Sequence, residues 1–83
     1  QESAAALARE VDAMIVIGGR NSSNTTRLAE ICSSVCGNTH HIERAQELDP
    51  VWFLDCAEVG ITAGASTPED QIAAVEARIA SLG

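Results

Sequence analysis

The sequence predicts an α/β fold: a small three-layer αβα domain in which helices cover both faces of a parallel sheet of three to four strands. An unbroken apolar run near the amino terminus is typical of a strand that is buried on both faces. Helical patterns alternate with short strand-like segments along the chain. The 83 residues, 46% of them hydrophobic, suit one domain and are too few for two. We therefore expect a single α/β domain over residues 1–83.

The first two elements are a helix and the central strand. Apolar residues from Ala4 onward recur at helical spacing, which predicts a helix that runs to about Glu10. Residues 13–17, AMIVI, form the apolar run, which ends at Gly18 and Gly19. This pattern predicts the most deeply buried strand of the sheet.

The middle of the chain contains a second helix and a second strand. Apolar residues recurring every three or four positions predict a helix over Ser23–Val35, with Gly37 as its left-handed terminator. A short strand is expected over residues 39–42. The segment 43–55 is irregular: it allows one helical turn near its start and another that begins at Pro50.

The carboxy-terminal part predicts a third strand and a last helix. Residues 59–62 have the composition of a strand. Thr67 can cap the helix, Pro68 suits its first position, and Asp70 completes a capping-box pattern. Three strands make a thin sheet, so we expect either a further strand upstream or an edge covered by another chain.

Charge and composition exclude several classes of function. Twelve acidic residues against five arginines and no lysine give a net charge of -7, which repels nucleic acid and anionic membranes. No apolar run is long enough for a membrane helix, and no signal peptide is recognisable. We expect a cytoplasmic protein with reduced thiols. The chain begins at Gln1 rather than Met, which suggests a trimmed piece.

The loop after the first strand is chemically unusual. Ligands of open parallel sheets bind beyond the carboxyl ends of the strands. Residues 18–26, GGRNSSNTT, include six consecutive polar uncharged residues, more than helix capping needs. Such a loop favours a ligand rich in oxygen atoms, because backbone N–H groups and the positive end of a helix bind phosphate without lysine.

The loop after the third strand has a similar position. Residues 62–68, TAGASTP, are small, and Gly64 permits close approach of a ligand. Taken alone, this loop is better explained as a turn with a capping box. If the two strands are neighbours, however, both helix amino-termini point into one volume. The expected donors are Ser22, Ser23, Asn24 and Ser66. No Walker or dinucleotide-binding motif is present.

The cysteines and histidines favour structural roles. Three cysteines could in principle surround an iron-sulfur cluster, but Cys32 falls on the predicted core face. His40 and His41 project from opposite faces of a strand, so they cannot chelate one ion together, and we expect surface or packing roles for them. The aromatic residues Trp52 and Phe53 are expected to anchor the irregular segment to the core.

Both loops and their surroundings resemble a known family. Residues 16–28, VIGGRNSSNTTRL, and 59–68, VGITAGASTP, are similar to the carboxy-terminal domain of LytB-type reductases, the 4-hydroxy-3-methylbut-2-enyl diphosphate reductase family. The resemblance spans nearly the whole chain, including the region of Asp49 and Trp52. It implies an iron-sulfur oxidoreductase of the non-mevalonate isoprenoid pathway, which removes the substrate hydroxyl as water and yields isopentenyl and dimethylallyl diphosphate.

The resemblance also implies roles for particular residues. Ser22, Ser23 and Asn24 match the motif that holds the substrate diphosphate, and Ser66 matches the serine of the second loop. In the family, three similar domains surround a 4Fe-4S cluster, and each supplies one cysteine. The cysteine of this domain would lie a few residues before Gln1, so Cys32, Cys36 and Cys56 inherit no metal-binding role and no residue of the chain is assigned as catalytic.

The chain is therefore expected to be the third domain of a three-domain enzyme and to be inactive alone. Its partners would be the other two domains, a small-molecule diphosphate and an electron donor such as ferredoxin or flavodoxin. About four hydrogen bonds of about 1.5–3 kcal/mol each, set against an association cost of about 4–15 kcal/mol, predict millimolar or weaker binding.

Two alternatives remain open at the level of sequence. The chain could be a stand-alone, non-catalytic module that binds phosphorylated metabolites. It could also be a purely structural domain in which both loops only cap helices. Binding of diphosphate to the two loops would exclude the structural alternative.

Overall fold

A parallel sheet forms the centre of the computed structural model, which describes residues 2–54, 56–65 and 67–82. Within these residues three strands make one sheet in the order β2-β1-β3. The strands are β1 (Ala13–Ile17), β2 (Thr39–Ile42) and β3 (Val59–Ala63). Both outer strands run parallel to β1, with Ile17 opposite Ile42 on one side and opposite Ala63 on the other. The predicted parallel sheet is confirmed.

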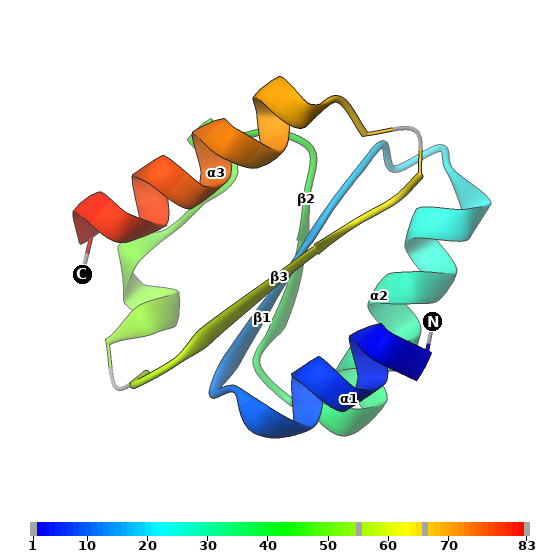
Figure 1. Cartoon of the computed structure of the whole chain (residues 1–83), viewed down its shortest axis with the longest axis horizontal. Coiled ribbons are helices and arrows are strands. Elements are labelled where there is room, and N and C mark those ends of the chain that lie inside the picture. The colour runs from blue at the N-terminus through cyan, green and yellow to red at the C-terminus, as the bar shows by residue number, and fades with distance from the viewer. Residues whose placement is uncertain (1, 55, 66, 83) are drawn as a thin grey trace.

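Helices cover both faces of this sheet, as Figure 1 shows. The helices are α1 (Glu2–Glu10), α2 (Ser23–Val35) and α3 (Glu69–Leu82), and two short 3-10 turns are η1 (Ala45–Glu47) and η2 (Pro50–Phe53). α1 and α2 pack on one face, whereas α3 and the two 3-10 turns pack on the other. The three-layer αβα arrangement is therefore confirmed.

Strand β1 contributes to both halves of the core. Met14 and Val16 pack beneath α1 and α2. Ile15 and Ile17 pack beneath α3, together with Val75. The alternation follows from the strand, because successive side chains point to opposite faces. All residues of β1 are fully buried, as the unbroken apolar run predicts.

The end of α2 differs from the prediction that Gly37 terminates it in a left-handed conformation. No described glycine has a positive φ. The helix ends at Val35, as predicted, but its C-cap is Cys36, whose backbone is extended, with φ -120° and ψ 111°. The Thr39 hydroxyl donates to the carbonyl of Cys36 at 2.6 Å. A residue of β2 thus satisfies a carbonyl at the helix end, and the chain turns directly into the strand.

The start of α3 also differs in detail. The helix begins at Glu69 rather than Pro68, and the carbonyl of Pro68 accepts the N–H groups of Gln71 and Ile72 at 3.2 and 3.3 Å. The Thr67 hydroxyl, expected as a cap, donates instead to a carbonyl of β1. Other boundaries agree to within two residues. Among the helices of the described chain, none has the length and hydropathy to cross a bilayer.

Candidate functional site

The loops after β1 and β3 meet at the carboxyl edge of the sheet (Figure 1). The carbonyl of Ile17, the last residue of β1, accepts two hydrogen bonds from the second loop. One comes from the backbone N–H of Gly64 at 3.0 Å, and the other from the hydroxyl of Thr67 at 2.9 Å. The two strands are therefore neighbours, as a site shared by both loops requires, and hydrogen bonds join the loops.

Thr25 lies where the two loops meet. Its side chain is fully buried. A Cβ added to Gly18 would come within 2.6 Å of both Cγ2 and Oγ1 of Thr25, and one added to Gly64 would overlap Oγ1. Both positions therefore require glycine for close approach. The sequence analysis did not single out Thr25, because in the sequence it is one of six consecutive polar uncharged residues.

Ser22 is the N-cap of α2, with φ -82° and ψ 112°. Its Oγ accepts the backbone N–H of Thr25 at 3.3 Å and the hydroxyl of Thr25 at 3.1 Å. A serine hydroxyl has two acceptor lone pairs and one proton to donate. Because both acceptor positions are occupied from within the protein, the proton remains for an outside acceptor. The helix cap uses the oxygen of Ser22 as an acceptor, whereas an anion would accept its proton, so the two interactions can coexist.

The two helices differ in charge at their amino-termini. α2 has no acidic residue in its first turn. α3 begins with Glu69 and Asp70, whose carboxylates compensate the positive end of its dipole. In a chain of net charge -7, the start of α2 is thus the more favourable of the two for an anion.

A groove continues outward from the start of α2. It is lined by Arg20, Asn21, Ser23, Asn24, Thr26, Arg27 and Glu30. Ser23 and Asn24 are exposed there, one and two residues beyond the cap. Three of the four residues predicted as donors are therefore brought together at the start of α2. The fourth, Ser66, lies outside the described residues.

A charged cluster that the sequence analysis did not find supports the first loop. The guanidinium of Arg20 pairs with Oε1 of Glu47. Oε2 of Glu47 accepts the backbone N–H groups of Glu43 and Arg44 at 2.8 and 3.1 Å. The carboxylate of Glu43 in turn accepts the backbone N–H of Arg20 at 3.2 Å. Arg20 lies more than twenty positions from both glutamates, so no local spacing connects it to them.

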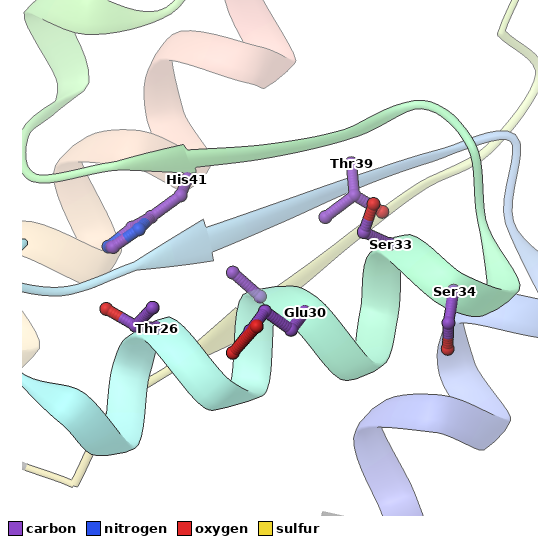
Figure 2. Close-up of a pocket in the computed structure, with 7 residues that line it drawn as sticks. Thr26, Glu30, Ser33, Ser34, Thr39 and His41 are labelled. Carbon is purple, nitrogen blue, oxygen red and sulfur yellow. The ribbon is translucent and has the colours of Figure 1, made fainter.

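His41 also contacts the first loop. Its Nε2 lies 3.0 Å from the carbonyl of Gly18, so the ring donates to the loop from strand β2. Figure 2 shows the neighbouring groove between β2 and α2, with His41 and Thr39 on the strand and Thr26 and Glu30 on the helix. The histidine holds the loop in place, in agreement with the packing role predicted for it.

His40 points to the opposite face and packs on Trp52. The two rings stack with centroids 3.9 Å apart and an interplanar angle of 5°. Nε2 of His40 lies 2.6 Å from Oδ1 of Asn38, whose amide nitrogen donates to the carbonyl of Trp52. Burial lowers the pKa of His40, and Asp49 opposes this shift. The predicted structural roles of His40 and Trp52 are confirmed.

The cysteines lie away from the two loops. Cys36 contacts the carbonyls of Val11 and Asp12, just before β1, and Cys56 precedes β3. Both thus lie toward the amino edge of the sheet. Cys32 is fully buried, and burial, with a smaller effect of Cys36, raises its pKa. No group of three possible metal ligands occurs among the described residues. These residues therefore do not fit an iron-sulfur cluster.

The fold and the loops together define a parallel α/β domain with hydroxyl and amide groups at an uncompensated helix amino-terminus, on the carboxyl edge of its sheet. A sequence model of the LytB protein family matches residues 1–80. The chain belongs to this family, which confirms the resemblance seen in the sequence.

Individual relatives agree with the family assignment. The chain is 62% identical over 79 residues to the 4-hydroxy-3-methylbut-2-enyl diphosphate reductase of Geobacter sulfurreducens, which covers 95% of this chain and 28% of that protein. It is 56% identical over 82 residues to the reductase of Pelobacter propionicus, covering 99% of this chain and 29% of that protein.

A solved structure of this reductase, described as the terminal enzyme of the non-mevalonate pathway, superimposes with a TM-score of 0.95 at 54% identity. The match covers 98% of this chain and 29% of the solved one. The chain thus spans less than a third of the length of these relatives.

Proposed function

We propose that the chain is the diphosphate-binding domain of a 4-hydroxy-3-methylbut-2-enyl diphosphate reductase. The intact enzyme would be an iron-sulfur oxidoreductase of isoprenoid biosynthesis that removes the hydroxyl of its substrate reductively, as water. This chain would be the third of three domains. Family membership supports the assignment, as do the names of the relatives. Its partners would be the other two domains and an electron donor such as ferredoxin or flavodoxin.

The observation that carries the proposal is the state of Ser22 at the start of α2. Its oxygen is already occupied by two donors from Thr25, so its proton is available to an anionic oxygen. Ser23 and Asn24 follow on the exposed surface of the same turn. A diphosphate presents only acceptors, which this set of donors and the positive helix end complement.

The role of these residues is to bind and orient. Ser22, Ser23 and Asn24 donate hydrogen bonds to the diphosphate, and Ser66 of the second loop is proposed to join them by resemblance to the family. None of them moves a proton in the reaction. By fixing the charged end of the substrate, the domain would direct the hydroxyl-bearing end toward groups outside this chain.

The iron-sulfur cluster of the intact enzyme would supply electrons, and its ligands are proposed to lie outside residues 1–83. The disposition of Cys32, Cys36 and Cys56 supports this view, because Cys36 and Cys56 lie toward the edge of the sheet opposite the loops and Cys32 is buried in the core. We assign no step of the reaction through the cluster to residues of this chain.

Two measurements on the 83-residue chain test the proposal. Amide chemical shifts are followed by NMR while inorganic pyrophosphate is added, with sodium chloride at matched ionic strength as the control. Shifts centred on Ser22 to Thr26, with a millimolar or weaker Kd, are expected. Unchanged shifts would favour the purely structural alternative. Turnover of 4-hydroxy-3-methylbut-2-enyl diphosphate with a chemical reductant is expected to be absent, and robust turnover would refute the need for further domains.

A further inference from the structure

The hydroxyl of Thr25 has a defined direction of donation. The side chain is fully buried, and in the described part of the chain its hydrogen-bonding partner is Oγ of Ser22, at 3.1 Å. If Ser22 donated to Thr25, the buried proton of Thr25 would lack an acceptor among residues 2–54, 56–65 and 67–82, which is unfavourable. Thr25 therefore donates and Ser22 accepts.

This direction determines what Ser22 can offer to a ligand. The backbone N–H of Thr25 occupies the second acceptor position of Ser22 Oγ at 3.3 Å. With both acceptor positions filled, Ser22 presents a donor to the outside. Phosphate oxygens at neutral pH are acceptors, so the hydroxyl is preorganised for them and offers nothing to a ligand amine or ammonium group.

We propose that Thr25 is the positioning residue of the two-loop site. By donating to Ser22 it fixes that hydroxyl as a donor to a phosphate oxygen, and by filling the space beside Gly18 and Gly64 it sets the distance between the loops. Because Thr25 is fully buried, it would act through Ser22 rather than by contact with the ligand. The inference rests on the proposed function and names the residue through which the site acts.

Two substitutions separate the hydroxyl from the shape of the side chain. Thr25→Val keeps the shape and removes the hydroxyl, whereas Thr25→Ser keeps the hydroxyl and removes the methyl group. If Thr25 served only to pack the loops, Thr25→Ser would weaken binding more than Thr25→Val. The proposal requires the reverse order: pyrophosphate binding about tenfold weaker for Thr25→Val, the size expected for loss of one hydrogen bond to a charged group, and retained within about twofold for Thr25→Ser.

Each variant is titrated with inorganic pyrophosphate and followed by amide shifts, which also report whether the chain is folded. If Thr25→Val does not fold, Thr25→Ala replaces it as the variant without a hydroxyl. Since alanine and serine are both smaller than threonine, packing alone predicts similar affinities. The proposal predicts binding at least about fivefold tighter for Thr25→Ser than for Thr25→Ala, and equal affinities would overturn it.

A double-mutant cycle with Ser22→Ala tests whether Thr25 acts through Ser22. In the Ser22→Ala background, removing the Thr25 hydroxyl is expected to change affinity by less than about twofold, because the group that it orients is absent. Independent, additive losses would overturn the inference. A wild-type chain that fails to bind pyrophosphate would instead refute the proposed function, so the two failures are distinguishable.

Discussion

The side chain of Thr25 occupies the space into which a Cβ on Gly64 would project. Gly64 begins the second loop, whereas Thr25 belongs to the first turn of α2. The loops therefore approach each other as closely as a residue without a side chain allows. This contact, together with the hydrogen bonds to the carbonyl of Ile17, makes the two loops one structural unit.

Adding a methyl group at this contact should destabilise the fold. Gly64→Ala is expected to lower the free energy of unfolding by about 1–3 kcal/mol, since Thr25 or the loop must move. Gly37→Ala is the matched control, because a Cβ there meets nothing within 4 Å and its φ is not positive. The control should change stability by less than about 1 kcal/mol. Urea denaturation measures the free energy of unfolding of both variants. Equal values for Gly64→Ala and Gly37→Ala would contradict the close contact between Gly64 and Thr25.

Ser22 and Ser23 are neighbours with separable roles. Ser22→Ala removes the cap of α2 and should lower the free energy of unfolding by about 1 kcal/mol, in addition to weakening pyrophosphate binding. Ser23 is exposed, so Ser23→Ala should weaken binding while changing stability by no more than about 0.5 kcal/mol. Denaturation and NMR titration of both variants give the two quantities. A Ser23→Ala variant that binds pyrophosphate like the wild type would remove Ser23 from the site.

The fold could be predicted from sequence because its signals are local. The run over Ala13–Ile17 reads as a doubly buried strand, and the bounds of α2 agree with its periodicity. The interactions that hold the first loop in place join residues that are far apart in the sequence. Glu47 lies in η1 and Arg20 in the loop after β1, and no periodicity connects them. The last residue of α2 was predicted correctly but its terminator was not, because the hydroxyl that satisfies the carbonyl of Cys36 comes from Thr39 of the next strand rather than from a glycine conformation.

Glu47 should contribute more to the stability of the fold than its ion pair with Arg20 alone would. The pair with Arg20 is partly exposed, at 62% and 26% of the side-chain surfaces, and such pairs contribute up to about 1 kcal/mol. Glu47 also accepts two backbone N–H groups that would lose their partner. Glu47→Ala should therefore lower the free energy of unfolding by about 1–2 kcal/mol, and Arg20→Ala by less than about 1 kcal/mol. Equal losses in urea denaturation would assign the whole effect to the ion pair.

The three thiols should differ in reactivity. Cys56 is half-buried, whereas Cys32 and Cys36 are buried, and burial raises the pKa of Cys32 so that its reactive thiolate is rare. Iodoacetamide at pH 8 should label Cys56 first and Cys32 only on unfolding. Mass spectrometry of timed samples, with a urea-unfolded sample as the control, measures the order. Labelling of Cys32 as fast as Cys56 in the folded chain would contradict its place in the core.

His40 should make stability depend on pH. Burial lowers its pKa in the folded state, against the opposing effect of Asp49. Between that lowered value and about 6.5, the unfolded chain binds more protons than the folded chain, so folding stability rises with pH through this window. The contribution is present above about pH 6.5 and is lost as pH falls through the folded-state pKa.

His40→Phe is the variant that isolates this contribution. It keeps a flat ring to stack on Trp52, removes the titrating group and loses the bond to Asn38 equally at every pH. Between pH 7.5 and pH 5.5 the wild type should therefore lose more stability than His40→Phe in urea denaturation. Parallel pH profiles for the two chains would show that the protonation of His40 is not linked to folding.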